Sequence, residues 1–229
     1  MSPTPDHIGT GDLAERLPAS VSLSAVTFED EEAIQWRDWL SQEERACIEG
    51  FGAASRRREF LAGRAAARQL LARELGVPPR DVPLRRADDD AVDVDAGNWF
   101  VSIAHSGPHA IAACSQHRIG VDLEHIQPRD KGLVRFLFSP DEHGVVDTLP
   151  YTGDASIILC WTLKEAVLKG RRTGFRTSPK GIHLTVNPEV ETAHAAVDDG
   201  MEWDLVYTER RGYWMAVAVP SSVTHPSGA

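Results

Sequence analysis

Residues 99–125 read WFVSIAHSGPHAIAACSQHRIGVDLEH, a stretch in which three apolar runs are separated by turn-forming residues. The runs have the length and composition of β-strands. Ser106-Gly107-Pro108 and a polar turn near Gln116 separate them. The sequence therefore predicts three consecutive strands at Trp99–Ile103, Ala110–Cys114 and Ile119–Glu124.

Helices are predicted upstream of these strands. Ser41 followed by Glu44 has the pattern of a capping box, which opens a short helix to about Gly50. A longer helix is expected from about Arg56 to Leu75, because it is rich in alanine and leucine and Gly76 can close it.

The downstream part also alternates between helix and strand. Residues 155–170 have the strongest helical pattern, and residues 131–138 form a second candidate, followed by a cap at residues 139–142. The remaining apolar runs predict strands at Ile182–Val186, Trp203–Tyr207 and Tyr213–Val219.

The two halves of the chain have the same order of elements, with helices first and strands after them. Helices combined with antiparallel hairpins are typical of an α+β protein. We expect two similar lobes, residues 1–116 and 117–229, related by a pseudo-twofold axis, with an active site between them.

Composition excludes several classes of protein. The 229 residues carry a net charge of −10, which argues against binding to nucleic acid. The sequence lacks a membrane-spanning apolar run, and its first residues lack the pattern of a signal peptide. Its three cysteines are widely spaced, which fits a reducing compartment rather than a zinc site or a disulfide framework. We expect a cytoplasmic monomer with frayed polar ends at residues 1–13 and 220–229.

Asp122 and Glu124 are the first candidate functional pair. Side chains alternate along a strand, so both carboxylates point to one face. Two neighbouring buried carboxylates are costly unless a cation neutralises them, and Mg²⁺ prefers such oxygen ligands. A solvated strand face is the alternative interpretation.

The helix at residues 155–170 carries the second candidate group. Trp161, Glu165 and Lys169 are spaced by four residues and share one face, whereas Lys164 lies about 100° around the axis from Glu165. A carboxylate beside lysines and a tryptophan suits a metal-bound pyrophosphate. A surface pair between Glu165 and Lys169 is the alternative.

His105 and Ser106 form the third candidate group, at the end of a predicted strand. Both side chains can donate a hydrogen bond to a phosphate. The alternative is that His105 is a bystander or a capping residue in the turn.

The order of these three groups resembles the 4′-phosphopantetheinyl transferase superfamily, in its monomeric, two-lobed type that activates polyketide and nonribosomal peptide synthases. The histidine–serine pair comes first, then G-x-D-x-E at Gly120–Glu124, then W-x-x-K-E-x-x-x-K at Trp161–Lys169. The upstream stretches SQEER and RRREFLAGRAAAR are similar to first-lobe helices of this family. The resemblance covers residues 41–169 and, more loosely, the closing strands.

The resemblance implies a holo-[carrier-protein] synthase that moves the 4′-phosphopantetheine arm of coenzyme A onto a carrier serine and releases adenosine 3′,5′-bisphosphate. It implies Mg²⁺, or Mn²⁺, on Asp122 and Glu165, with Glu124 as a third ligand or a water-mediated one. Glu165 matches the general base, with Glu124 as the alternative because a metal-bound carboxylate is a poor base. Lys169 matches a residue that stabilises charge on the leaving group.

The resemblance also implies residues that bind coenzyme A. Lys164 and Lys169 match positions near its phosphates, and His105 matches a contact to the 3′-phosphate of the nucleotide. Arg56 and Arg64 resemble an arginine pair that grips the same ligand, although Arg57 and Arg58 are neighbouring alternatives to these two.

Two positions depart from the family pattern. Ala104 stands where many relatives have serine before the histidine. The aspartate-rich stretch DDDAVDVDAGN at residues 88–98 stands where relatives often carry a lysine segment. We therefore expect other residues to bind the adenine or the phosphate where relatives use this serine and lysine.

The expected protein partner is an acyl or peptidyl carrier protein. Carrier proteins are acidic on their recognition helix, so docking on this acidic enzyme needs a local basic or apolar patch, which we expect near Arg171, Arg172 and Phe175. Two other functions remain open: a coenzyme A-binding module of the same fold without transfer, and a metal-dependent phosphohydrolase using the same carboxylates.

Overall fold

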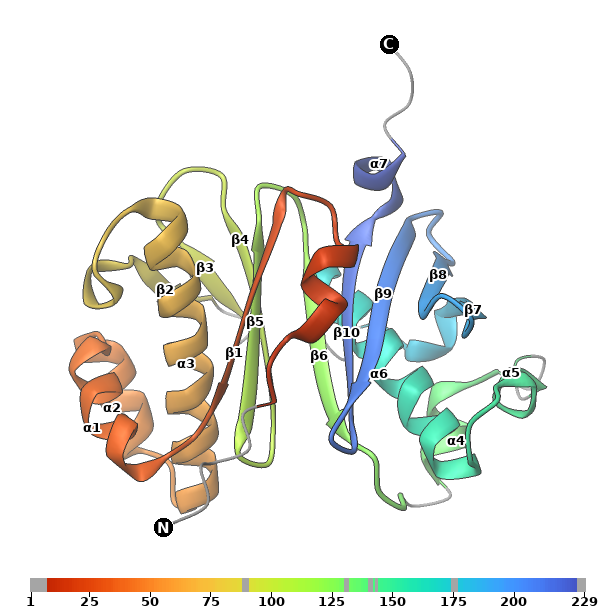
Figure 1. Ribbon diagram of the computed structural model, residues 1–229, viewed down its shortest axis with the longest axis horizontal. Coiled ribbons are helices and arrows are strands. Elements are labelled where there is room, and N and C mark those ends of the chain that lie inside the picture. The colour runs from red at the N-terminus through yellow and green to blue at the C-terminus, as the bar shows by residue number, and fades with distance from the viewer. Residues whose placement is uncertain are drawn as a thin grey trace.

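Two five-stranded antiparallel sheets stand face to face at the centre of the molecule, with helices on the outer side of each (Figure 1). The structure is a computed structural model that describes residues 8–87, 91–129, 132–139, 142, 144–173 and 177–225. Side chains of both sheets, among them Ala104, Ile111, Val121 and Val217, form a buried cluster where the sheets meet. The interface between the lobes is therefore a hydrophobic core of its own.

The first half of the chain builds the first sheet and its helices. Its elements are η1 (Gly11–Arg16), β1 (Val21–Thr27), α1 (Asp30–Trp39), α2 (Gln42–Glu49), α3 (Ala54–Leu75), η2 (Pro79–Asp81), β2 (Leu84–Arg86), β3 (Val92–Val94), β4 (Phe100–Ser106) and β5 (His109–Ser115).

The second half builds the second sheet and its helices. Its elements are β6 (Gly120–His125), α4 (Gly132–Leu137), α5 (Gly144–Thr148), α6 (Gly153–Arg171), η5 (Pro179–Gly181), β7 (Ile182–Asn187), β8 (Thr192–Val197), β9 (Glu202–Arg210), β10 (Tyr213–Pro220) and α7 (Ser221–Thr224).

The two sheets have the same strand order. The first is β1-β5-β4-β3-β2 and the second is β6-β10-β9-β8-β7, so every strand has a counterpart five strands later. Along the chain, the longest helix of each half comes after the first strand of that half and before the second. Helix α3 comes between β1 and β2, and α6 comes between β6 and β7. The predicted α+β fold with two similar lobes is confirmed. The division at residues 116 and 117, which falls in the connection between β5 and β6, stays a prediction.

Local sequence signals place the ends of the predicted helices. Ser41 Oγ accepts a hydrogen bond from the Glu44 amide, and the Glu44 carboxylate accepts one from the Ser41 amide, which completes the predicted capping box of α2. Helix α3 ends at Gly76 with a φ of 67°, the left-handed conformation that glycine adopts without a steric penalty. The strands predicted at residues 99–124 correspond to β4, β5 and β6.

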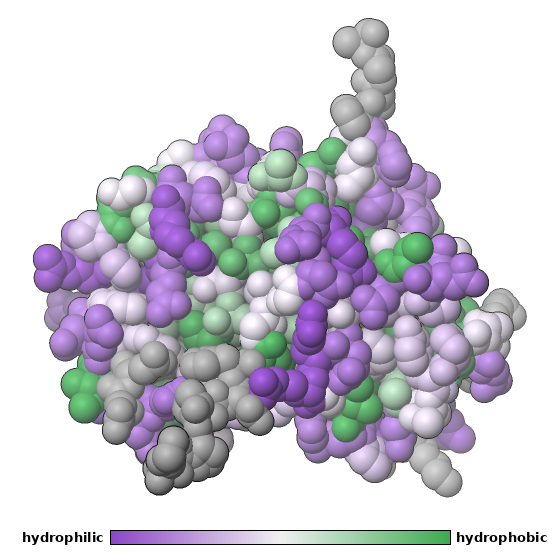
Figure 2. Space-filling model, in the orientation of Figure 1, coloured by the Kyte–Doolittle hydropathy of each residue, from purple (hydrophilic) through white to green (hydrophobic). Residues whose placement is uncertain are grey.

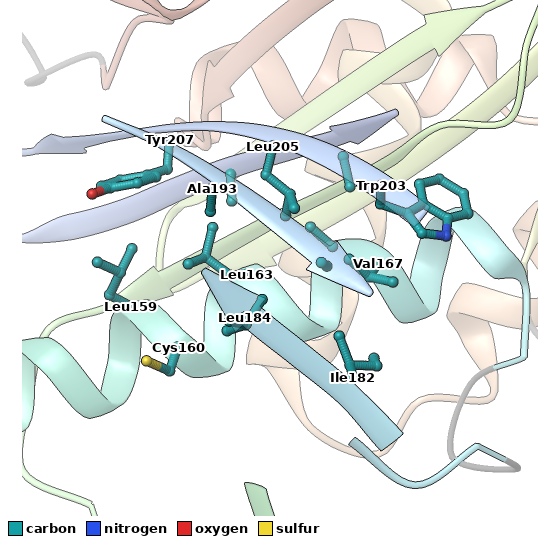
Figure 3. Packing of buried hydrophobic residues seen from close by; sticks show 14 of the residues in the cluster. Leu159, Cys160, Leu163, Val167, Ile182, Leu184, Ala193, Trp203, Leu205 and Tyr207 are labelled. Carbon is teal, nitrogen blue, oxygen red and sulfur yellow. The ribbon is translucent and has the colours of Figure 1, made fainter. Parts of the chain in front are cut away.

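Helix α6 packs along the second sheet through a continuous apolar face. Leu163 and Val167 on the helix face Leu205 and Trp203 on β9 (Figure 3). At Gly120 the helix comes closest to β6, because a Cβ atom there would lie 1.8 Å from the Ala166 carbonyl oxygen. Glycine at this position therefore lets β6 and α6 approach closely, which brings their polar side chains together.

The prediction of a frayed N-terminal end is wrong over the described residues. Ile8 and Leu13 are buried in the cluster between the sheets. Arg16 then reaches the second lobe, where it donates a hydrogen bond to the Tyr207 carbonyl oxygen at 2.8 Å and forms a 3.0 Å ion pair with Glu191. This segment ties the two lobes together because its apolar side chains fill the gap between them.

The C-terminal end also differs from the prediction. Pro220 ends β10 and residues 221–224 form the short helix α7, whereas residues 226–229 lie outside the described residues.

On the face shown in Figure 2, hydrophobic residues are interspersed among hydrophilic ones. No helix in the described ranges is long and apolar enough to cross a membrane.

Candidate active site between the two lobes

Two serine hydroxyls on β4 accept hydrogen bonds from the backbone of β6 and so join the two sheets at the site. Ser102 Oγ accepts a hydrogen bond from the Val121 amide at 3.0 Å, and Ser106 Oγ accepts one from the His125 amide at 3.2 Å. These bonds place the end of β4, which carries His105, beside the strand that carries Asp122. Ser106, which the sequence placed at a phosphate, thus joins the two lobes.

Asp122 and Glu124 both point towards α6, as strand alternation predicts. Lys169 Nζ donates a hydrogen bond to Asp122 Oδ1 at 2.7 Å, and Trp161 Nε1 donates one to Glu124 Oε1 at 2.9 Å. Arg129 donates to the other Glu124 oxygen at 2.8 Å. The expected four-residue face of α6 is therefore present, and Lys169 pairs with Asp122.

Glu165 completes a cluster of three carboxylates. Burial raises the pKa of Glu165 to about 7, and the negative charge of Asp122 adds to this shift. The pKa of Glu124 is raised by the same two causes. Within the part of the chain that the structure describes, Glu165 Oε1 and Asp122 Oδ2 are buried without a hydrogen-bond partner. In this part of the chain, one oxygen of each of these two carboxylates therefore lacks a hydrogen-bond donor.

The donor set fits a hard divalent cation. Mg²⁺ takes carboxylate and phosphate oxygens as ligands, and Asp122 and Glu165 would each offer it a buried oxygen without a hydrogen-bond partner among the described residues. Among the described residues, however, no three histidine, cysteine or acidic side chains are assembled closely enough to hold a metal ion by themselves. The three-carboxylate ligand set therefore stays a prediction.

A cavity of about 360 Å³ in the first lobe reaches α6 at Lys169, the partner of Asp122, whereas the three carboxylates are not among its lining residues. Among the described residues that line it, Glu59 supplies the single carboxylate. The cationic or titratable nitrogen groups in its wall are Arg56, Arg64, Arg86, His105, Lys169 and Arg172. A concentration of positive charge in a protein of net charge −10 is suited to a polyanionic ligand.

Two arginines of α3 lie in the cavity wall beside aromatic rings. Arg64 Nε lies 2.9 Å from Glu44 Oε1, and its guanidinium stacks on Phe60 with 4.7 Å to the ring centroid. Arg56 lies over Phe51 at 5.6 Å. Both predicted arginines thus line the cavity.

The neighbouring arginine alternatives do not line this cavity. Arg57 and Arg58 line a separate groove beside α1. His105, by contrast, lies in the cavity wall with Nδ1 3.8 Å from Glu59 Oε2. Burial lowers the pKa of His105, so its imidazole is mostly neutral at pH 7 in the absence of a ligand.

Lys164 is not brought to the cavity, which corrects the expectation that it lies near the coenzyme A phosphates. Its side chain is fully buried on another side of α6. Nζ donates hydrogen bonds to the carbonyl oxygens of Leu137 at 2.8 Å and Pro179 at 3.0 Å and to Glu142 at 3.3 Å. The rotation of about 100° that separates it from Glu165 turns it into the protein interior.

The expected docking residues Arg171 and Arg172 do not form an outward basic patch. Arg171 is mostly buried and forms a 2.6 Å ion pair with Asp199. Arg172 crosses to the first lobe, where it pairs with Asp93 and lines the cavity. Phe175 lies outside the described residues. The positions of the two arginines therefore do not support carrier docking through them.

Comparison with known proteins places both lobes in one family. Residues 43–115 match the family model described as the 4′-phosphopantetheinyl transferase N-terminal domain. Residues 118–218 match the model of the 4′-phosphopantetheinyl transferase superfamily.

Individual relatives agree with the family models. The chain is 31% identical over 176 residues to the 4′-phosphopantetheinyl transferase HetI of Nostoc sp., a match that covers 73% of this chain and 72% of the relative. It is 28% identical to the phosphopantetheinyl transferase of Thraustochytrium sp., covering 73% of this chain and 65% of that protein. It is also 30% identical to enterobactin synthase component D of Salmonella typhimurium, covering 65% of this chain and 59% of that protein.

The cleft geometry and the comparisons with known proteins point to the same enzyme family. The matched regions contain the cationic cavity wall from the first lobe and the three carboxylates from β6 and α6. Enzymes of this family use coenzyme A as a substrate, which is consistent with a cavity suited to a polyanion. The chain therefore belongs to the 4′-phosphopantetheinyl transferase superfamily and is a phosphopantetheinyl transferase.

Proposed function

We propose that the enzyme transfers the 4′-phosphopantetheine arm of coenzyme A to a serine of an apo carrier protein and releases adenosine 3′,5′-bisphosphate. The observation that carries this proposal is the continuity of the cleft. Its cationic wall runs from Arg64 in the first lobe to Lys169 on α6, whose Nζ is 2.7 Å from Asp122 in the carboxylate cluster. A ligand with phosphates along its length can contact both ends at once.

The first-lobe wall would bind the nucleotide end of coenzyme A. Arg64 is held by stacking on Phe60 and by its ion pair with Glu44, so little side-chain entropy is lost when it binds a phosphate, and the exposed Arg56 beside Phe51 supplies a second cation in the same wall. His105 can donate a hydrogen bond from the same wall. These residues would orient the ligand with its pyrophosphate towards Lys169.

Asp122 and Glu165 are the residues that would hold Mg²⁺, or Mn²⁺, because each has a buried carboxylate oxygen without a partner. The ion would supply a Lewis acid that neutralises charge on the pyrophosphate. Glu124 is placed differently, since Trp161 and Arg129 each donate a hydrogen bond to one of its oxygens. Glu124 could still contact the ion through a water molecule.

The arrangement favours Glu124 as the group that accepts the serine proton, directly or through a water molecule. In the transfer, the serine Oγ forms a bond to the β-phosphorus of coenzyme A, and the bond from that phosphorus to the bridging oxygen breaks. The serine proton goes to the carboxylate, whose pKa is raised by burial and by Asp122. Lys169 offsets negative charge that develops on the leaving bisphosphate.

The proposed acceptor is an acyl or peptidyl carrier protein of polyketide or nonribosomal peptide synthesis. The name of the Salmonella relative, a component of enterobactin synthase, supports an acceptor within a synthase. We also propose that the enzyme is a monomer in the cytoplasm.

The proposal is tested by incubating the enzyme with coenzyme A and Mg²⁺, with and without apo carrier protein, and measuring the adenosine 3′,5′-bisphosphate that is released. We expect one bisphosphate for each serine modified and none without carrier. Release without carrier would indicate a phosphohydrolase instead. Binding of coenzyme A without release in either reaction would indicate a binding module that has lost transfer.

A further inference from the structure

Arg172 ends α6 in an unusual backbone conformation. Its φ of 57° and ψ of 32° lie in the left-handed region. For a residue with a Cβ atom this conformation costs about 1 kcal/mol, and such strain is found preferentially at ligand-binding and catalytic sites. Left-handed residues also end helices routinely, so the contacts of the Arg172 side chain decide whether the conformation serves more than the helix end.

The side chain of Arg172 crosses from the second lobe to β3 of the first. Nη1 donates a hydrogen bond to a carboxylate oxygen of Asp93, and Nη2 donates one to the Val92 carbonyl oxygen at 2.7 Å. The guanidinium carbon lies 5.9 Å from the centroid of the Phe100 ring. These contacts fix the cation in one place, so it is pre-organised for a ligand.

The fixed guanidinium forms part of the cavity wall, together with His105 and Lys169. A guanidinium has five N–H donors, so the two bonds to β3 leave donors for an anion in the cavity. Asp93 is also held by Arg85 at 2.9 Å, so its carboxylate is itself fixed in place. The arrangement is an arginine positioned by an aspartate at a cleft suited to phosphate.

We infer that Arg172 binds a phosphate of the adenosine 3′,5′-bisphosphate part of coenzyme A, and that Asp93 is the positioning residue that holds it there. This inference rests on the proposed function, because it assigns a contact within the same cleft. It also agrees with the course of the chain, because the side chain that follows α6 reaches β3 across the cleft. It also gives a role to one aspartate of the acidic stretch.

Arg172→Gly is the sharpest variant for a test. Glycine adopts the left-handed conformation without strain, so the variant removes the cation while favouring the same helix end. Arg171→Ala is the matched control, because Arg171 is the adjacent arginine and pairs with Asp199 away from the cavity wall. Asp93→Asn keeps an oxygen acceptor but removes the charge that holds the guanidinium.

The experiment is titration calorimetry of adenosine 3′,5′-bisphosphate into each full-length protein, without metal or carrier. We expect Arg172→Gly to weaken the Kd by about tenfold or more, as for loss of a charged hydrogen bond, and Arg171→Ala to change it less than about twofold. Asp93→Asn should weaken it by a smaller factor, because Val92 still holds the guanidinium.

Two results would overturn this inference alone. Wild-type affinity in a folded Arg172→Gly protein would remove the contact, with folding checked by its melting temperature. Wild-type affinity in a folded Asp93→Asn protein would remove the positioning role of Asp93. Failure of the wild-type protein to bind either the bisphosphate or coenzyme A would instead overturn the proposed function with it.

Discussion

Lys169 Nζ lies 2.7 Å from Asp122 Oδ1, so one cation serves both the carboxylate cluster and the cavity that leads into the first lobe. The Lys169 side chain remains about one-third exposed, whereas that of Asp122 is almost fully buried. This pair compensates the buried negative charge of Asp122. It also places an ammonium group between the cavity and the carboxylates, where the proposed function puts the pyrophosphate.

Removing this ammonium group should affect rate and metal affinity in opposite directions. We expect Lys169→Met to lower kcat by about a hundredfold or more, because charge on the leaving group loses a stabilising partner. The apparent affinity for Mg²⁺ should rise, since the lysine no longer competes for Asp122. Initial rates across a Mg²⁺ titration measure both effects. Lys180→Met, at an exposed lysine on η5, is the control and should change neither.

The division of roles among the three carboxylates is separable by metal titration. Asp122→Asn and Glu165→Gln should raise the Mg²⁺ concentration needed for half-maximal activity at least tenfold, because each removes an unpartnered anionic oxygen. Glu124→Gln should lower kcat and leave that concentration within about threefold. If Glu124→Gln shifted the metal requirement as strongly as Asp122→Asn, Glu124 would be a direct ligand and the base would be another group.

Glu165 should make the metal-free protein less stable as pH rises. Its pKa is about 7 in the folded protein against an ordinary value of 4.5, so the folded state binds the proton more tightly than the unfolded state. Stability is therefore lost as pH rises from about 4.5 to about 7. We expect Glu165→Gln to raise the free energy of unfolding by about 1 kcal/mol or more at pH 8 and to change it little at pH 4.

Urea unfolding in the presence of a chelator measures this difference at both pH values. An equal effect of Glu165→Gln at pH 4 and pH 8 would mean that titration of Glu165 does not contribute to the pH dependence of stability. Mg²⁺ should reduce the difference in free energy of unfolding between Glu165→Gln and the wild-type protein at pH 8, because it compensates the ionised carboxylate of the wild type.

Lys164 should matter for folding rather than for ligand binding. Lys164→Met leaves Glu142 and the carbonyl oxygens of Leu137 and Pro179 without their buried donor. We expect a loss of about 3–5 kcal/mol in stability, with part of it restored by Glu142→Gln in the same chain. The Kd for coenzyme A of the folded protein, measured by calorimetry at low temperature, should stay within about twofold of wild type. A large loss of affinity without a loss of stability would place Lys164 at the ligand.

Short-range patterns predicted the part of the site that lies on single elements. Strand alternation predicted that Asp122 and Glu124 point the same way, and helix periodicity predicted the face shared by Trp161 and Lys169. The capping box at Ser41 was visible for the same reason, since its partner is three residues away. The relative order of the motifs then indicated the family.

Contacts between distant residues were outside the reach of these patterns. Asp93 and Arg172 are separated by 79 positions, and neither belongs to a motif that predicts the other. Helix geometry gave the rotation between Lys164 and Glu165, but it did not say which of the two faces the core. The end at Ile8 and Leu13 looked polar overall, and its two buried side chains are fixed by packing between the sheets.

The intact mass of an apo carrier protein after incubation with the enzyme, coenzyme A and Mg²⁺ tests the central claim most directly. The wild-type enzyme is expected to add the mass of one phosphopantetheine group to the carrier, and a carrier with its acceptor serine changed to alanine should gain nothing. Asp122→Ala and Glu165→Ala should abolish or strongly slow the gain. An unmodified carrier in the wild-type reaction, or full activity in both variants, would contradict the assignment of this cleft.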